Sequence, residues 1–175
     1  MTFDLAEVRQ ILEGTPASLR ATLGGLSNGW LDADEGDGTW TPWQALAHMT
    51  HVEELDWIGR IETILEHGAD EVLGPVDREA GFDRYAGWSV GRVLERFAEI
   101  RSTNLERLDT FALSDDDLRR EGRHADFGIV TLGQLLATWA VHDLNHQSQI
   151  VKTLAKRYRD AIGPWRAFAN VVDVP

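Results

Sequence analysis

Two histidines, His142 and His146, are the residues of this sequence best placed to do chemistry together. They are four residues apart in a segment with helical spacing of apolar residues, so their side chains project from one face of a helix. Two imidazoles at this spacing can bind a single divalent ion. The same face continues through Leu135, Trp139 and Ile150, which directs both histidines toward an apolar interior. The alternative is a pair of core histidines that are hydrogen-bonded to the backbone or to a carboxylate.

Two imidazoles do not complete a metal site, so we expect a third ligand on another helix. His48 is the preferred candidate, because Val52 and Leu55 follow it on one helical stripe that faces the core. His51 is the rival, but its acidic neighbours favour a position at the rim of the site. The two remaining histidines, one at a helix end and one in a loop, are expected to be incidental: His67 and His124.

Four helices must position these residues. Apolar spacing and capping residues predict them at 4–26, 42–67, 89–109 and 131–158. The first is expected to be kinked or divided at Thr15-Pro16, since Thr and Pro are typical of a helix start. Gly59 is the expected weak point of the second helix, because glycine has low helix propensity.

The remaining segments are predicted to be connections and a tail. Loops are expected at 27–39, 68–88 and 110–130, and Ile129-Val130 is too short to predict a strand. After Gly163-Pro164, an apolar C-terminal tail is expected to pack back on the body. The predicted fold class is therefore all-α: a single four-helix-bundle domain over 1–175 with a kinked N-terminal helix, three long helices and a short C-terminal tail.

Composition excludes several kinds of function. The chain has no cysteine, which rules out disulfides, iron–sulfur clusters and a thiol nucleophile from the protein itself. A formal net charge of −12 argues against nucleic-acid binding and against docking on an anionic membrane. There is no secretory signal pattern and no apolar run long enough to span a bilayer, so we expect a cytoplasmic protein with a small-molecule substrate.

Two segments resemble the DinB family, the DinB/YfiT-like metalloenzymes. In the first, Trp40-Thr41-Pro42-Trp43 precedes His48, and Glu53 follows five residues later. The second, Val130 to Ile150, contains the His142-Asp143-Leu144-Asn145-His146 sequence, and the closing Gly163-Pro164-Trp165 is also similar. The resemblance covers essentially the whole chain in order.

The resemblance implies a fold and a metal site. The fold is the DinB-like four-helix bundle, which has an unusual connection, and the protein is expected to form a homodimer. Carried over residue by residue, the metal ligands become His48, His142 and His146. Three nitrogen ligands leave at least one coordination position for water or substrate. Three imidazoles suit Zn, Ni, Fe or Mn, so the sequence does not choose among these metals.

Three functions follow from such a site. The first expectation is a metal-dependent enzyme that transfers a low-molecular-weight thiol to an electrophilic substrate, since some DinB-like relatives use bacillithiol or mycothiol in this way. The thiol would be a cosubstrate, because the chain has none. One alternative is a metal-dependent hydrolase of a small amide or ester that uses metal-bound water. The other is a non-catalytic, stress-associated metal-binding module.

Several other side chains are assigned from their angular positions on the helices. Trp139 is expected at the pocket wall, Gln149 on the ligand face, and Asp143 in a bond to another helix or to an imidazole N–H. Glu53 is expected to be a structural carboxylate that does not point at the metal. Trp57 is about 180° from His48 around the helix axis and is therefore expected to face away from the site.

Two loop arginines are candidates for substrate binding. Arg78 and Arg123 lie in the predicted loops 68–88 and 110–130 and could hold an anionic substrate. The alternative is that both are solvated, which is the more common state of a loop arginine.

Overall fold

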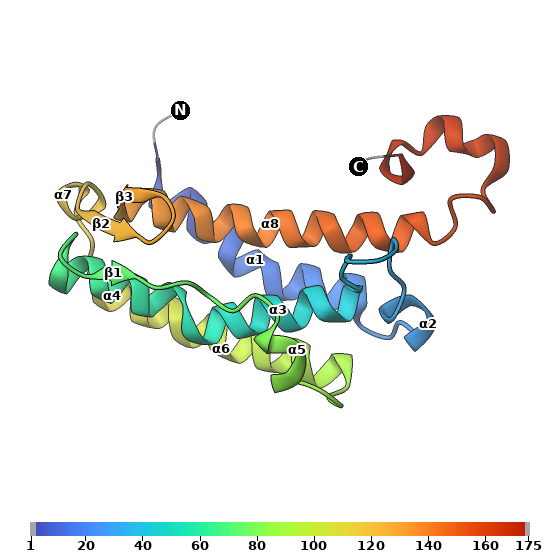
Figure 1. The fold of residues 1–175 in the computed structure, drawn as a ribbon, viewed down its shortest axis with the longest axis horizontal. Coiled ribbons are helices and arrows are strands. Elements are labelled where there is room, and N and C mark those ends of the chain that lie inside the picture. The colour runs from blue at the N-terminus through green and yellow to red at the C-terminus, as the bar shows by residue number, and fades with distance from the viewer. Residues whose placement is uncertain (1–2, 174–175) are drawn as a thin grey trace.

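The long helices form a four-helix bundle, as the sequence predicts (Figure 1). The computed structural model describes residues 3–173. Three columns of the bundle are single helices and one column is divided into two: α1 (Leu5–Leu23), α3 (Pro42–Leu55) followed by α4 (Trp57–His67), α6 (Val90–Thr110) and α8 (Leu132–Lys156). Helices α1 and α3 each pack against α6 and α8, so these two consecutive long helices occupy opposite corners of the bundle.

The two helices that carry the candidate ligands begin at matching caps. The Thr41 hydroxyl accepts a hydrogen bond from the Gln44 backbone N–H, and the Gln44 side chain accepts one from the Thr41 N–H. Thr131 and Gln134 make the same pair of bonds at the start of α8. These capping boxes satisfy N–H groups that the first turn of a helix leaves without a partner, so they fix where α3 and α8 begin.

The two predictions about helix continuity differ in outcome. Of the alternatives for the first helix, kinked or divided, only the divided form is wrong: α1 is one helix that continues through Pro16, and its cap is Asp4, whose carboxylate accepts from the Ala6 N–H. The long helix predicted at 42–67 is interrupted at Asp56, and not weakened at Gly59, which lies inside α4. Asp56 has φ −106° and ψ −59°, which ends the regular turn geometry of α3.

A small sheet covers one end of the bundle where the sequence predicts only loops. Its strands are β1 (Val72–Leu73), β2 (Glu121–His124) and β3 (Gly128–Thr131). Strand β1 pairs in parallel with β2, and β2 pairs antiparallel with β3, which includes Ile129-Val130. A Cβ at Gly122 would lie 2.6 Å from the Ile64 side chain, so glycine there lets β2 approach α4 closely. The sheet thereby places the His124 end of β2 beside the bundle.

Short helices and a tail complete the structure. The short elements are α2 (Asn28–Leu31), α5 (Ala80–Arg84), α7 (Asp115–Leu118) and the 3₁₀ helices η1 (Gly163–Phe168) and η2 (Asn170–Val172). The tail packs on α8 through η2, where Val172 is buried. Trp165 and Phe168 are 72% and 84% exposed, so the expectation that these two aromatic residues pack on the body is wrong.

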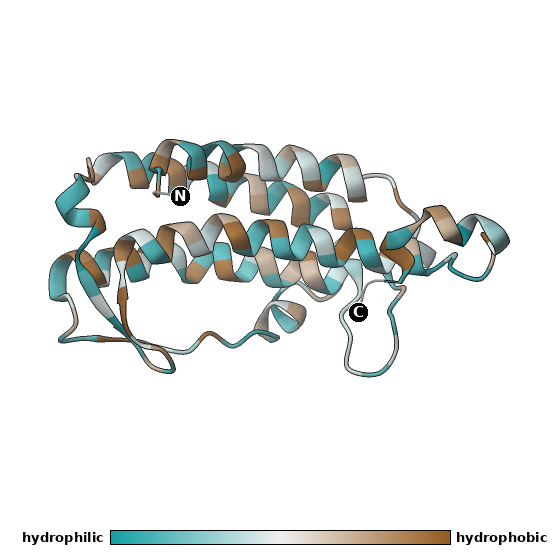
Figure 2. Ribbon diagram, turned by 90° about the horizontal axis from the view of Figure 1, so that it is seen from above, coloured by the Kyte–Doolittle hydropathy of each residue, from teal (hydrophilic) through white to brown (hydrophobic). Residues whose placement is uncertain are grey.

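The core consists of two apolar clusters with a polar layer between them. One cluster includes Leu12, Leu105 and Ala140, and the other includes Leu19, Phe97 and Ile150. Between the two clusters, the helices contribute buried polar or charged side chains at the same level: Thr15, His48, Glu53, Arg101, Asp143 and His146. Brown and teal segments alternate along each long helix in Figure 2, as expected for amphipathic helices.

No helix within residues 3–173 combines the length and the apolar character of a membrane-spanning segment.

Candidate metal centre

The three predicted ligands meet in the polar layer. His48 comes from α3, and His142 and His146 come from successive turns of α8. Each offers one ring nitrogen, and the three nitrogens all lie within 4.8 Å of one another. The Nε2 atoms of His48 and His142 are 3.2 Å apart. Two imidazole nitrogens bound to one ion at about 2.0–2.1 Å would have a similar separation.

Neighbouring groups fix the ring orientation of two of these histidines. Nδ1–H of His48 donates to the backbone oxygen of Arg78 at 2.8 Å. Nδ1–H of His146 donates to Oε1 of Gln149 at 2.9 Å. A proton on Nδ1 leaves Nε2 as the atom with a free lone pair, which is the form that binds a metal. Nδ1 of His142 is buried and has no hydrogen-bond partner among the described residues.

All three rings are neutral at pH 7. Burial lowers the pKa of His48 to about 4 and the pKa of His142 to about 2. Burial also lowers the pKa of His146, and the positive charge of Arg78 acts in the same direction on all three rings. Neutral imidazoles are the metal-binding form, so the donor set fits a divalent ion such as Zn without prior loss of a proton.

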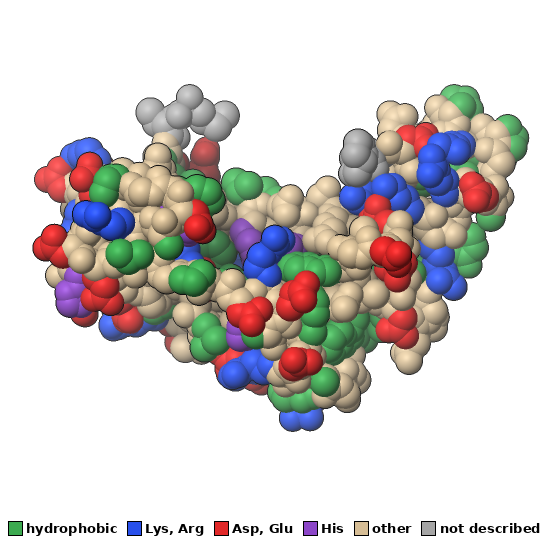
Figure 3. Space-filling view, viewed as in Figure 1, with side chains coloured by type: hydrophobic (Ala, Val, Ile, Leu, Met, Phe, Trp, Pro, Cys, Tyr) green, Lys and Arg blue, Asp and Glu red, His purple; other side chains and the backbone are tan. Residues whose placement is uncertain are grey.

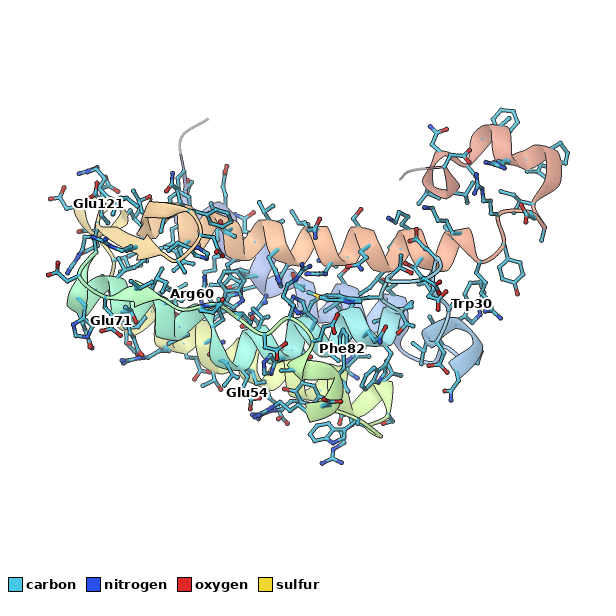
Figure 4. All side chains as sticks on the ribbon, in the orientation of Figure 1. Trp30, Glu54, Arg60, Glu71, Phe82 and Glu121 are labelled. Carbon is cyan, nitrogen blue, oxygen red and sulfur yellow. The ribbon has the colours of Figure 1, made fainter. Side chains whose placement is uncertain are left out.

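The candidate site opens into a cavity of about 460 Å³, which we call the metal cavity after its candidate ligands. Its lining combines the three histidines with an apolar wall and with polar groups from α4 and its junction with α3, the segment before α5, the β2–β3 hairpin and α8. The apolar wall consists of Val52, Trp57, Pro75, Val76 and Phe127. The polar groups are Asp56, Arg60, Arg78, His124, Asp126 and Asn145. Arg60, labelled in Figure 4, donates to the backbone oxygen of Gly74 at 2.8 Å and pairs with Asp56.

A second cavity of about 350 Å³ lies beside the first, and Arg78 belongs to the lining of both. Trp40 lines the second cavity, and its ring is stacked on His146 with centroids 6.0 Å apart and planes at 11°. Its ring also lies 4.8 Å from that of His48. Trp40 therefore covers two of the ligand rings on the side of the second cavity.

A buried charge cluster lies behind the ligands. Arg101 of α6 is 1% exposed and makes two hydrogen bonds to Glu53 of α3, both 2.8 Å. It donates to Asp143 of α8 at 2.7 and 3.1 Å and to the backbone oxygen of Leu12 in α1 at 2.8 Å. One guanidinium thus connects all four columns of the bundle. Because Asp143 follows His142 directly, the cluster also fixes the position of α8 along the bundle axis at the candidate ligands.

Several sequence assignments agree with this geometry. Glu53 is a structural carboxylate that accepts from Arg101, Asn104 and Trp139. Asp143 bonds to another helix through Arg101, one of the two roles predicted for it. Gln149 contacts a ligand directly and also lines the second cavity.

Both tryptophan assignments need correction. Trp57 does not face away from the site: its ring lies 5.4 Å from that of His142, edge to face, and it lines the metal cavity. Trp139 is fully buried and lies outside the cavity lining, with its ring stacked on Trp57 at 5.6 Å. The interruption at Asp56 explains the error for Trp57. The predicted direction of that side chain is counted in helical turns from His48, and such a count holds only within one regular helix, whereas α3 ends before Trp57.

Three further positions differ from expectation. Leu55 is 58% exposed, so the core-facing stripe after His48 runs through Val52 to the cavity residue Asp56. His51 is buried and not at the rim, since Gly81 of α5 packs on its Cβ. His124 is not incidental, because it lies in β2 and lines the metal cavity.

The other two assignments concern the surface. His67 is half-exposed near Glu66 and Glu71 at the end of α4 and does not belong to the group of three histidines. Arg123 donates to the backbone oxygen of Ala69 at 3.0 Å and does not line the metal cavity. Of the two loop arginines, the structure brings only Arg78 to the candidate centre.

The pKa values predict how the metal-free protein responds to acid. The folded state keeps His48 and His142 neutral down to about pH 4 and pH 2, whereas an unfolded histidine takes up a proton near pH 6.5. The unfolded state therefore binds more protons between pH 6.5 and 4, and stability falls as the pH falls through that window. Urea midpoints of chelator-treated protein at pH 7.5, 6 and 5 measure this. His67→Gln, at an exposed position, should show the same dependence as the original chain, and a midpoint that rises toward pH 5 would contradict the expectation.

Comparisons with known proteins agree with the fold. YfiT from Bacillus subtilis, described as a probable metal-dependent hydrolase with an unusual four-helix bundle topology, is 24% identical, with a TM-score of 0.75 over 87% of this chain and 86% of YfiT. TT2238, a four-helix bundle protein, is 22% identical, with a TM-score of 0.57 over 85% of this chain and 98% of TT2238. A search of curated proteins gives no match. The sequence profile of the DinB superfamily matches residues 11–150, and the chain therefore belongs to that superfamily.

Proposed function

We propose that this protein is a metal-dependent hydrolase of a small ester or amide. The observation that carries the proposal is the convergence of three neutral imidazole nitrogens within 4.8 Å on the wall of a cavity of about 460 Å³. An all-nitrogen set of three ligands is typical of catalytic centres that keep one coordination position for water or substrate. The description of YfiT as a probable metal-dependent hydrolase supports the same chemistry.

The chain's own residues would divide the work in the following way. His48, His142 and His146 would hold the ion, while the Arg78 carbonyl and Gln149 keep two of the rings in the metal-binding form. A divalent ion in such a set lowers the pKa of a bound water to about 7 and polarises a carbonyl oxygen. The apolar wall of the cavity, which includes Trp57 and Phe127, would bind the hydrocarbon part of the substrate and exclude water from it.

The test is hydrolysis without any added thiol. Protein prepared without a histidine tag and loaded with Zn, Ni, Fe or Mn should release product from a panel of aryl esters and acyl anilides. A chelator should abolish turnover and the added metal should restore it, whereas His67→Ala, at a half-exposed site, should keep full activity.

The same assay separates the other functions that the sequence allows. Turnover that appears only with a low-molecular-weight thiol would favour thiol transfer, the first expectation from the sequence, over hydrolysis. A large loss of melting temperature on chelation, with no reaction under any condition, would favour the non-catalytic metal-binding module.

The expected homodimer stays a prediction. The outer face of α8 carries exposed apolar side chains at Val141, Leu144 and Val151, and the tail adds Trp165 and Phe168. Side chains of this kind are typical of surfaces that a second subunit covers.

A further inference from the structure

Arg78 is a cationic side chain that the protein leaves without an anionic partner. Within residues 3–173 its guanidinium makes no ion pair and no hydrogen bond, and its contact is with the ring of Trp40, 5.2 Å from the centroid. Two neighbouring carboxylates have other partners: Asp77 accepts from the backbone of Glu79 and Ala80, and Glu35 from Thr153 and Lys156. The positive charge of Arg78 is therefore available to a ligand.

The position of Arg78 is fixed relative to the metal ligands. Its backbone oxygen accepts from Nδ1–H of His48 at 2.8 Å, so the main chain at residue 78 is bonded directly to a ligand ring. Trp40, the ring below the guanidinium, is stacked on His146 and tilted against His48. A loop arginine in solvent has neither constraint, so Arg78 differs from the common case of a solvated side chain.

The two cavities meet at this residue. Arg78 lines the metal cavity together with the three histidines, and it lines the second cavity with Trp40 and Gln149. In Figure 3, a basic side chain lies beside histidine side chains on the face that the reader sees. A ligand bound at the three histidines can thus extend to Arg78 without leaving the metal cavity.

The electrostatic setting selects an anion. The candidate ligands are three neutral imidazoles, so an ion held there keeps its full charge, and Arg78 adds another positive charge nearby. Among the other charged groups of the same cavity, Asp56 pairs with Arg60, and Asp126 is the one further carboxylate of the lining. A planar guanidinium binds a carboxylate through two parallel N–H···O bonds, an arrangement that an ammonium cannot reproduce.

We propose that Arg78 is a specificity-determining residue that binds a carboxylate of the substrate, so that the substrates are esters or amides with a carboxylate a few atoms from the scissile carbonyl. This inference rests on the proposed function, because it names the substrate class of the same site. Binding of the carboxylate at Arg78 and of the carbonyl at the histidines would orient the substrate along the two connected cavities.

The test measures binding and does not depend on turnover. Straight-chain dicarboxylates from malonate to adipate are titrated into zinc-loaded protein by calorimetry, with butyrate as the monocarboxylate reference. The best dicarboxylate should bind at least about 10-fold more tightly than butyrate, because only it reaches both groups. Arg78→Gln should weaken that dicarboxylate roughly 10- to 100-fold and change butyrate less than about threefold.

A matched control is available in the same chain. Arg92 also lies over a tryptophan, with its guanidinium 3.5 Å from the centroid of the Trp88 ring, but it does not line the metal cavity. Arg92→Gln should leave the affinity for both probes unchanged, and Arg78→Lys should retain part of the dicarboxylate preference. Melting temperatures within about 1 °C of one another would show that these variants fold alike.

The outcomes separate this inference from the proposed function. Equal affinity for every dicarboxylate and for butyrate, or an equal loss of both in Arg78→Gln, overturns the role of Arg78. Dicarboxylate binding that depends on Arg78 supports the anion site even when no ester or amide is hydrolysed. Hydrolysis of a neutral ester at the same rate as its carboxylate-bearing analogue, with Arg78→Gln unaffected, supports the hydrolase and overturns the substrate class.

Discussion

His142→Ala is expected to weaken zinc binding roughly 100- to 1000-fold and to reduce hydrolysis to background. The reason is the donor set: one nitrogen of three is lost, and zinc sites bind their ion through contributions of several kcal/mol from each ligand. His142 suits this test because its Nδ1 has no hydrogen-bond partner among the described residues, so truncation removes a metal donor without breaking another polar contact on that side. Competition with a chromogenic chelator at pH 7.5 measures the affinity.

The control for this experiment is a histidine of the same cavity. His124 lines the wall on β2 but lies outside the group of three nitrogens, so His124→Ala should keep the zinc affinity within about threefold. Comparison of metal-free melting temperatures separates loss of the ligand from loss of the fold. If His142→Ala binds zinc as tightly as the original chain, the three histidines do not form the metal site.

The convergence of His48, His142 and His146 could be predicted because its signals are local. The i, i+4 spacing of His142 and His146 lies within one uninterrupted helix, so both side chains stay on one face. The start of α3 is equally local, since the capping box at Thr41 places His48 two turns into the helix. Helix starts and faces of this kind depend on residues within one or two turns.

Long-range features could not be predicted in the same way. The interruption at Asp56 changes the direction in which Trp57 points, and helical angles counted from His48 contain no information about it. Strand β1 has two residues and exists through its pairing with β2, about fifty residues later in the chain. Periodicity within a window of sequence does not detect either feature.

Arg101 shows the same limit for a single residue. In the sequence it is one arginine among the apolar positions of the helix predicted at 89–109, where an exposed side chain is the ordinary interpretation. In the structure it is buried because carboxylates from two other helices, Glu53 and Asp143, face it across the bundle. The partners lie more than forty residues away, so only the tertiary arrangement identifies this layer.

Arg101→Met is therefore expected to cost about 3–5 kcal/mol of unfolding free energy, a large share of the stability of a domain of this size. Methionine fills much of the space but leaves two carboxylates buried without their cation. Burial already raises the pKa of Asp143, and Arg101 opposes that shift; without the guanidinium the pKa rises further. A carboxyl whose folded pKa exceeds its unfolded value favours the folded state at low pH and loses that contribution as the pH rises. The deficit of the variant should consequently be smaller at pH 5 than at pH 8 in urea titrations.

Two further variants decide whether buried charge is the cause. Arg107 pairs with Glu62 at the surface of the same helix and is half-exposed, so Arg107→Met should cost less than about 1 kcal/mol. In the Arg101→Met background, Asp143→Asn should recover part of the loss, because Glu53 keeps Asn104 and Trp139 as donors whereas Asp143 loses its ion-pair partner. Two results would contradict this account: a loss of unfolding free energy in Arg101→Met no larger than in Arg107→Met, or a deficit that grows toward pH 5. Either would mean that apolar packing, and not this ion cluster, holds the four columns together at the level of the candidate metal ligands.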